Sequence, residues 1–374
     1  MITFIQHVIV TILIGYLGIT QSIATFIDSV VGSASHETTP SVSETSSALE
    51  RITSIADKYA SVTQRVLLEN REFQRAATIA STYDEYTDSN LLNIPTDTLI
   101  RNALVNVFCQ YKTDTFIRTT TGSGFIINPK GIILTNAHVA QFLLLEGTDN
   151  VVHDTECVIR TGNPATPTYH AELLYISPTW IFENASLIDD EDPQGTGERD
   201  YALLYISRSF DKQPLPTAFH YLPPDPELLP RSTAGIEVLS AGYPAGKLLK
   251  NGPEVKLKPV IAENTIGTLY TFGSNYADIF SVSGSAVGEQ GASGGPVVTQ
   301  NKKAIGLIVT KGSLDEGDDS LRALTLSYID RTIREETGFS LTENMHGDVA
   351  LRGHIFKKAI GPFLSGLLEA ELRE

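Results

Sequence analysis

The stretch Gly288–Pro296 places a serine, Ser293, among glycines and between two apolar segments. A serine hydroxyl becomes a nucleophile when a base takes its proton and backbone N–H groups stabilise the oxyanion that forms. Gly291 can adopt backbone angles that other residues avoid, so the N–H groups of Gly291 and Ser293 could both face a substrate carbonyl. An ordinary glycine-rich turn before a strand would explain the same residues. The choice depends on whether the chain supplies a base and a group that orients it.

Histidine is the side chain best suited to be that base. His138 is favoured because two apolar runs, within residues 122–134, lead directly into it and would fix its position. A core histidine without a catalytic role is the alternative interpretation. The candidates considered are His138, His153, His170 and His220.

Asp200 is the candidate for the group that orients the histidine. It stands directly before the apolar run 201–206, which is expected to be a buried strand, and a buried aspartate requires a partner. The aspartates of the acidic run 189–192 are expected to be solvated instead. An imidazole that acts as a base needs such an anion to hold its tautomer. The three candidates are, in chain order, His138, Asp200 and Ser293.

Short runs rich in β-branched and aromatic residues must position these side chains. From Leu99 onward they alternate with turn signals, and Asn128–Gly131 is typical of a hairpin connection. Many short strands without intervening helical patterns predict an all-β sandwich or barrel. The proline-rich stretch 213–231 predicts an irregular crossing between two halves. The runs lie at 103–111, 124–127, 132–134, 157–160, 171–176, 201–206, 237–241, 265–272, 296–299 and 304–310.

Two other stretches interrupt the strand pattern, and a helix is predicted after it. The acidic stretch Trp180–Glu198 and residues 315–319 are expected to be surface loops. Ser327–Asp330 has the spacing of a capping box, which predicts a helix that runs to Thr337 and stops at Gly338.

The N-terminal part differs in character from the rest. Residues 1–28 are largely apolar, with the densest part at 8–19, and are long enough to cross a bilayer. A cleaved signal peptide is the competing interpretation, although no Lys or Arg precedes Arg51. Residues 29–47 are small, polar and acidic, which predicts a flexible linker. A heptad-like series over 48–90 predicts a helical stalk, either a coiled coil or a single helix against the next domain.

Composition excludes some classes of function. The chain has 374 residues and a formal charge of −16, and it has no basic stripe, which argues against nucleic-acid binding. Its two cysteines, Cys109 and Cys157, could pair in an oxidising compartment, while two buried free thiols are the simpler expectation. No metal or cofactor site is expected.

Three sequence blocks resemble the signature blocks of trypsin-like serine proteases, and the closest branch is the HtrA/DegP type. The blocks are Thr135–Val139, Arg199–Leu204 and Gly291–Pro296, supported by Gly122–Gly124, Ala241–Pro244 and Ile305–Ile308. The resemblance implies a double six-stranded β-barrel over about 95–338, with the site between the barrels. It implies that His138 is the general base, Asp200 its orienter and Ser293 the nucleophile. The N–H groups of Gly291 and Ser293 would form the oxyanion hole.

The resemblance also places a specificity pocket. Val287 at its base would disfavour an Arg or Lys side chain, because nothing there would neutralise the charge. Cleavage after small or medium aliphatic residues is therefore expected. The residues implied to bind substrate are Val287, Gln290, Val309, Thr310 and Lys311.

Departures from the family pattern also carry information. Ala292 stands where digestive trypsin-like enzymes have an aspartate that pairs with a new N-terminus. Activity is therefore expected to depend on loop ordering. Residues 339–374 are expected to be a C-terminal tail, too short for the PDZ domain that HtrA-type proteins usually carry.

These features lead to three hypotheses. The first is a membrane-tethered serine endopeptidase that acts on unfolded or damaged extracytoplasmic proteins, at the periplasmic side or the cell surface. The protein would be secreted if the N-terminal segment is cleaved. The second is a non-catalytic binding or chaperone module with the protease fold, and the third is an assembly protein that works through a self-associating stalk.

Overall fold

The computed structural model describes residues 93–113, 117–148, 153–190, 196–246, 256–283, 287, 291–311 and 321–372. The segments predicted to form an anchor (1–28), a linker (29–47) and a stalk (48–90) lie outside the described residues. Within the described ranges, no helix combines the length and the apolar character needed to span a bilayer.

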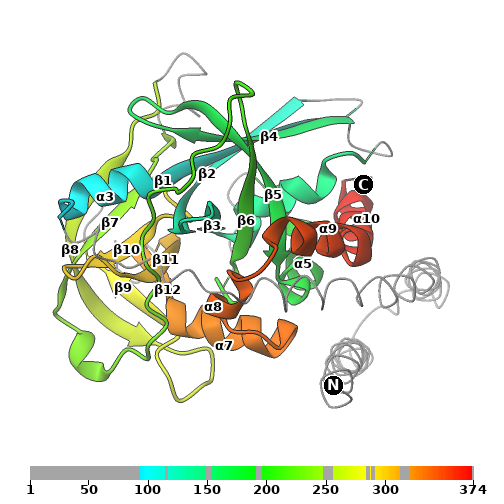
Figure 1. The fold of residues 1–374 in the computed structure, drawn as a ribbon. Coiled ribbons are helices and arrows are strands. Elements are labelled where there is room, and N and C mark those ends of the chain that lie inside the picture. Colours follow the sequence, from blue (N-terminus) through cyan, green and yellow to red (C-terminus); the bar gives the residue numbers. More distant parts are fainter. Residues whose placement is uncertain are drawn as a thin grey trace, which may run out of the picture.

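The described strands form two closed antiparallel barrels of six strands each (Figure 1). The strand order is β1-β2-β3-β6-β5-β4 in the first barrel and β10-β11-β12-β9-β8-β7 in the second. The first barrel contains β1 (Leu104–Lys112), β2 (Ile117–Asn128), β3 (Ile132–Thr135), β4 (His153–Thr161), β5 (Thr166–Ile176) and β6 (Ala202–Ser209). The second contains β7 (Glu237–Gly242), β8 (Val260–Tyr270), β9 (Ile279–Val282), β10 (Pro296–Thr299), β11 (Ala304–Lys311) and β12 (Leu321–Thr325).

This architecture confirms the predicted double six-stranded β-barrel. One apolar cluster fills the first barrel and extends over the contact surface between the barrels, where Tyr243 and Val309 belong to it. A smaller cluster fills the second barrel and includes Phe280 and Val297. The barrels are therefore joined by apolar packing, which fixes the residues at their junction.

The two predicted connections are also confirmed. Asn128–Gly131 joins β2 to β3, and Gly131 has a φ of +85°, which suits glycine. The proline-rich segment 213–231 makes backbone hydrogen bonds first to one barrel and then to the other. The N–H of Leu222 donates to the carbonyl of Ile126 in β2 at 2.9 Å, and the N–H of Asp225 donates to the carbonyl of Ala304 in β11 at 2.8 Å.

Helices surround the barrels, and helix α7 begins differently from the prediction. Its N-cap is Thr325, whose hydroxyl accepts the Tyr328 N–H at 3.0 Å, so the predicted capping box at Ser327 is wrong. Ser327 instead lies buried in the first turn. The predicted stop is confirmed, since Gly338 has a φ of +80°. The helices are α3 (Thr96–Ala103), α4 (Ala137–Ala140), α5 (Pro178–Asn184), α7 (Leu326–Thr337), α8 (Leu341–Asn344), α9 (Val349–Ala359) and α10 (Gly361–Glu371), with 3-10 turns η2 (Gln141–Leu145), η3 (Ala185–Leu187) and η4 (Arg231–Thr233).

The stretch Trp180–Glu198 is not a surface loop along its whole length. Its first part forms α5 and η3, and Trp180 and Ile181 are buried. Ser177 caps α5 by accepting the Trp180 N–H at 3.2 Å. The acidic run at 189–192 led to the prediction of a loop for the whole stretch. The N-cap of this short apolar helix, Ser177, lies just before the stretch.

The segment predicted to be a tail contributes to the folded domain. Helix α9 packs on β5 and β6, and α10 packs on α5 and η2 of the first barrel (Figure 1). Leu364 and Leu368 of α10 are fully buried. A Cβ on Gly353 would lie 2.6 Å from the Tyr205 ring, so α9 approaches the barrel closely there.

Cys109 and Cys157 form a disulfide, so the expectation of two free thiols is wrong. The two residues face each other as register partners on β1 and β4. Forty-eight positions separate them in the chain, so only the strand pairing brings the thiols together.

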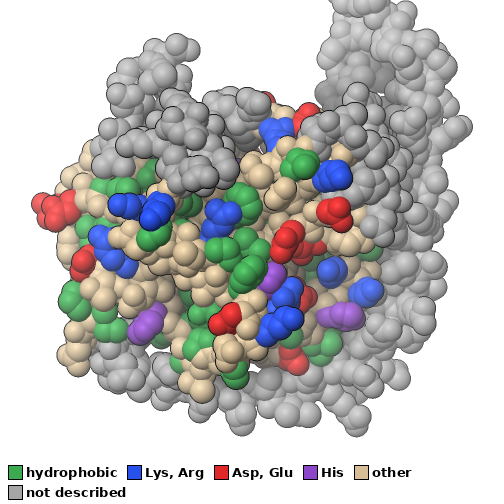
Figure 2. Space-filling model, turned by 90° about the horizontal axis from the view of Figure 1, so that it is seen from above, with side chains coloured by type: hydrophobic (Ala, Val, Ile, Leu, Met, Phe, Trp, Pro, Cys, Tyr) green, Lys and Arg blue, Asp and Glu red, His purple; other side chains and the backbone are tan. Residues whose placement is uncertain are grey.

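Charged side chains of both signs are interspersed on the face seen in Figure 2. Its described lysine and arginine side chains lie among acidic and hydrophobic ones and do not gather into one stripe. This pattern is typical of a solvated protein surface.

Candidate active site

His138 is held by the short helix α4, which follows β3 directly. Its neighbours Ala137 and Val139 are buried, so the helix is fixed against the first barrel. A Cβ on Gly122 of β2 would lie 2.4 Å from Cγ2 of Val139. The absence of a side chain at Gly122 therefore lets α4 pack closely on β2.

His138 and Asp200 are hydrogen-bonded to each other, as the prediction requires. The His138 Nδ1 lies 2.7 Å from Asp200 Oδ2, and the His138 backbone N–H donates to Oδ1 at 3.0 Å. Only 6% of the Asp200 side chain is exposed, against 23% for His138. Because the carboxylate accepts at Nδ1, that nitrogen carries the proton and Nε2 remains free to act as a base.

The electrostatics of this pair alter the histidine. Burial lowers the pKa of His138, but the charge of Asp200 and its hydrogen bond together raise it by more, so the net pKa lies above 6.5. The Asn136 side chain donates to the backbone carbonyl of Asp200 at 2.8 Å, which helps to fix the position of the Asp200 main chain.

If His138 is the base, activity will fall as the pH is lowered through its raised pKa, because the imidazolium cannot accept a proton. The midpoint is expected above the usual histidine value of 6.5. The stability that the protonated pair contributes has the opposite dependence. It is fully present below 6.5 and is lost as pH rises through the folded pKa.

Rates of peptide hydrolysis and urea unfolding, both measured across pH, test this prediction. A rate limb centred well below 6.5 would contradict it.

Ser293 lies on a tight turn that packs against the first barrel. Gly294 has a φ of +88°, and a Cβ there would lie 1.9 Å from the carbonyl oxygen of Ser123 in β2. The Ser123 N–H also donates to the Ser293 carbonyl at 2.7 Å. Because β2 pairs with β3, which leads into α4, these contacts bring the turn to the side of the first barrel that carries His138.

The serine hydroxyl points at a carbonyl in this structure. Ser293 Oγ lies 3.4 Å from the Val309 oxygen, and within the described residues it has no hydrogen bond to His138. The backbone N–H groups of Gly291 and Ser293 have no acceptor among the described residues. Two donors on one turn are thus available to an oxyanion, while the hydroxyl must rotate to reach an imidazole.

Ser123 orders this turn, a role that sequence reasoning missed. Its buried hydroxyl donates to the Gly291 carbonyl at 2.7 Å and accepts the Tyr243 N–H at 2.8 Å. The sequence analysis named Ser123 only as part of the block Gly122–Gly124. Only the three-dimensional structure reveals this role, because Gly291 lies 168 positions away in the chain.

Replacing Ser123 with alanine should lower kcat by about 10- to 100-fold with little change in KM, because the Gly291 carbonyl loses the donor that holds the turn and its N–H groups in place. Steady-state kinetics on a peptide substrate measure both constants. Ser240→Ala is a matched control, since Ser240 is also buried but bonds Asn264 within the second barrel. Equal losses of kcat in both variants would contradict this role for Ser123.

The residues predicted to bind substrate are only partly visible. Val287 is buried in the cluster of the second barrel, and Val309 is buried in the other cluster, close to Gly197. Gln290 lies outside the described residues, as do the side chains of Thr310 and Lys311. The specificity pocket and its aliphatic preference stay predictions.

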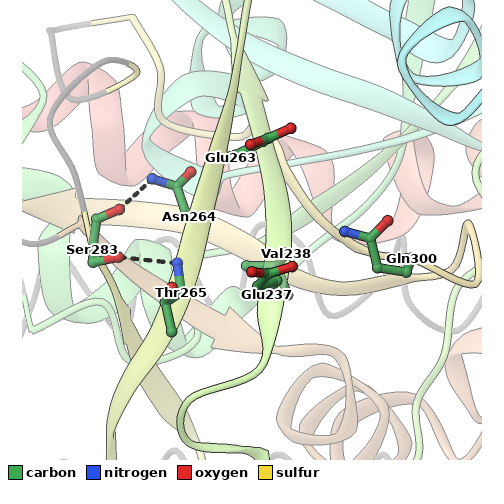
Figure 3. A pocket seen from close by; sticks show the side chains of 7 residues that line it. All are labelled: Glu237, Val238, Glu263, Asn264, Thr265, Ser283 and Gln300. Carbon is green, nitrogen blue, oxygen red and sulfur yellow. Dashed lines mark hydrogen bonds between the residues drawn. The ribbon is translucent and has the colours of Figure 1, made fainter.

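A depression on the second barrel is a different feature (Figure 3). It is lined by β7, β8, Ser283 and Gln300, and none of the predicted site residues borders it. Its carboxylates come from Glu237 and Glu263. In the part of the chain that is described, no group of three or more metal-ligating side chains occurs.

Two β-barrels, with a histidine–aspartate pair on the first and a serine-bearing turn on the second, define a chymotrypsin-like fold. Residues 122–307 match the family described as the trypsin-like peptidase domain, so this chain carries a domain of that family. No curated protein gives a significant match to the sequence.

The solved structures that are similar to this chain include two forms of one protease. The active form of the Rv3671c protease from M. tuberculosis is 20% identical, with a TM-score of 0.39, over 68% of this chain and 88% of that one. The inactive form of Rv3671c, a serine-to-alanine mutant, is 20% identical, with a TM-score of 0.38, over 67% and 94%. The family assignment rests on the domain match.

Proposed function

We propose that this protein is a serine endopeptidase that hydrolyses peptide bonds through an acyl-enzyme. The observation that carries the proposal is the 2.7 Å hydrogen bond between His138 Nδ1 and the buried Asp200 carboxylate. It gives the imidazole the orientation and tautomer that a general base needs. The turn at Ser293, with two unoccupied N–H groups among the described residues, supplies the matching nucleophile.

In the proposed mechanism Ser293 Oγ attacks the scissile carbonyl carbon while His138 Nε2 takes its proton. The oxyanion that forms accepts hydrogen bonds from Gly291 and Ser293. The C–N bond then breaks, the leaving amine takes the proton from His138, and the acyl group stays on Ser293. Water attacks the acyl-enzyme, His138 accepts its proton and returns it to Ser293 as the carboxylic acid leaves.

The proposal includes the HtrA-type branch, in which the active turn is ordered by its surroundings. Ala292 cannot form an ion pair with a cut N-terminus. Ser123, Tyr243 and the carbonyl of Ile308 instead hold the turn, the last by accepting the Gly294 N–H at 2.8 Å. These contacts support a site that needs no cleavage of the chain to become ordered.

We further propose that the domain works outside the cytoplasm, tethered by residues 1–28, with residues 48–90 as a stalk that allows self-association. The disulfide supports this location, because disulfides persist in oxidising compartments. The apolar composition of residues 8–19 supports the tether. The substrates in this proposal are unfolded or damaged proteins.

Digestion of an intrinsically disordered protein and of a stable folded protein tests the proposal. The wild-type chain should cleave the disordered substrate faster, and a serine-directed covalent inhibitor should stop the cleavage. Cleavage that a metal chelator stops and the serine inhibitor does not would contradict it, as would cleavage of neither substrate.

A further inference from the structure

The turn that carries Asp200 is bound to helix α7 on both sides of the aspartate. The Arg199 N–H donates to the Tyr328 hydroxyl at 3.1 Å, and the Tyr201 hydroxyl lies 2.8 Å from Thr332 Oγ1. Tyr328 and Thr332 belong to α7, which follows the last strand of the second barrel. The helix that follows the second barrel thus holds the first-barrel loop that carries the aspartate.

Arg199 has an unusual backbone conformation. Its φ is +56°, in the left-handed region that residues with a Cβ rarely occupy. The turn is tight on both sides, since Asp200 N–H donates to the Gly197 carbonyl at 3.2 Å and Tyr201 N–H donates to the Arg199 carbonyl at 2.8 Å. A conformation of this kind persists only where the surroundings enforce it.

Glu336 of α7 stabilises this conformation of Arg199 by binding the arginine side chain. Its carboxylate accepts Arg199 Nη1 and Ser177 Oγ, each at 2.9 Å, and also the Tyr175 hydroxyl. Only 14% of its side chain is exposed. The neighbouring Glu335 lies 3.3 Å from Arg199 Nη2, but 62% of its side chain is exposed, so solvent screens that contact more strongly.

The charges around Arg199 favour this arrangement. Burial lowers the pKa of Arg199, but Glu336, and after it Tyr328, Tyr201 and Glu335, raise it by more. Glu183 of α5 belongs to the same group, and its pKa is raised first by burial and then by Glu198. Arg199 is therefore a cation among several carboxylates, of which Glu336 is its closest partner.

We propose that Glu336 is a positioning residue for the Asp200–His138 pair. Its ion pair with Arg199 stabilises the left-handed turn that directs the Asp200 carboxylate toward the imidazole. The inference rests on the peptidase function proposed above. Glu336 bonds Arg199, Ser177 and Tyr175 and not the reacting groups, so its effect passes through Arg199.

Glu336→Gln keeps the shape of the side chain and removes the charge that holds Arg199. We expect a loss of about tenfold in kcat with KM unchanged, well short of the roughly 10⁴-fold loss when a triad aspartate is replaced. The acidic limb of the rate profile should move to lower pH, since a misaligned Asp200 raises the histidine pKa less. Tyr328→Phe, which removes the acceptor of the Arg199 N–H, should act in the same direction.

Glu335→Gln is the matched control and should leave kcat and the pH profile at wild-type values. A Glu336→Gln protein that folds but retains the wild-type kcat and pH profile overturns the inference, and so does an equal effect of Glu335→Gln. If Glu336→Gln does not fold, Arg199→Gln, which removes the other partner of the same ion pair, decides by the same two readouts. An inactive wild-type protein would instead overturn the proposed function itself, so the two failures are distinguishable.

Discussion

Ser293→Ala is expected to lower kcat for peptide hydrolysis on the order of 10⁶-fold, to the level that binding and the oxyanion donors alone support. Gly294, the next residue, lies so close to the Ser123 carbonyl of β2 that it fixes the turn that carries this hydroxyl. KM should change little, since the substrate contacts remain. The measurement is a progress curve on a peptide substrate at high enzyme concentration.

The same variant should fold as well as the wild type. Among the described residues, the serine hydroxyl makes one 3.4 Å hydrogen bond, to the Val309 carbonyl, so its removal should change the free energy of unfolding by less than about 0.5 kcal/mol. Thermal unfolding of both proteins provides the control. Hydrolysis that persists at the wild-type rate in a folded Ser293→Ala protein would show that this serine is not the nucleophile.

Asp200→Asn is expected to lower kcat by about 10⁴-fold, because the amide nitrogen of asparagine can donate to Nδ1 and select the wrong tautomer of His138. The substitution also removes the charge that raises the pKa of His138. Residual activity should therefore titrate at lower pH than wild-type activity. The pH dependence of kcat/KM for both proteins measures the two effects together.

Asp278→Asn is the matched control for this substitution. Asp278 is fully buried in the second barrel and accepts hydrogen bonds from Ser274 and Phe272 while pairing with Arg331. Its replacement should lower stability without a comparable loss of kcat. Similar kinetic losses in the two variants would mean that Asp200 acts through general stability and not through His138.

The parts of the fold that were predictable depend on local sequence. The β2–β3 connection follows from the turn residues Asn128–Gly131, and the crossing follows from the prolines between 213 and 231. The His138–Asp200 pair was predicted because each residue adjoins an apolar strand that fixes it. These signals come from neighbours in the chain, and no knowledge of strand pairing is needed to see them.

The parts that were missed depend on contacts between distant residues. The disulfide needs the register of β1 against β4, and the role of Ser123 needs the approach of the two barrels. Arg199 and Glu336 lie 137 positions apart, so their pairing has no local signature. The N-cap of α7 was misplaced because Ser327 has an acidic residue, Asp330, three positions later, whereas Thr325, the N-cap, has Tyr328 at that spacing.

Labelling with a fluorophosphonate probe, followed by mass spectrometry of the digested protein, tests the central claim most directly. We expect one adduct, on Ser293, that is absent from Ser293→Ala and forms far more slowly in Asp200→Asn. An unlabelled wild-type protein, or an adduct on a different serine, would contradict the assignment of Ser293 as a nucleophile activated by His138 and Asp200.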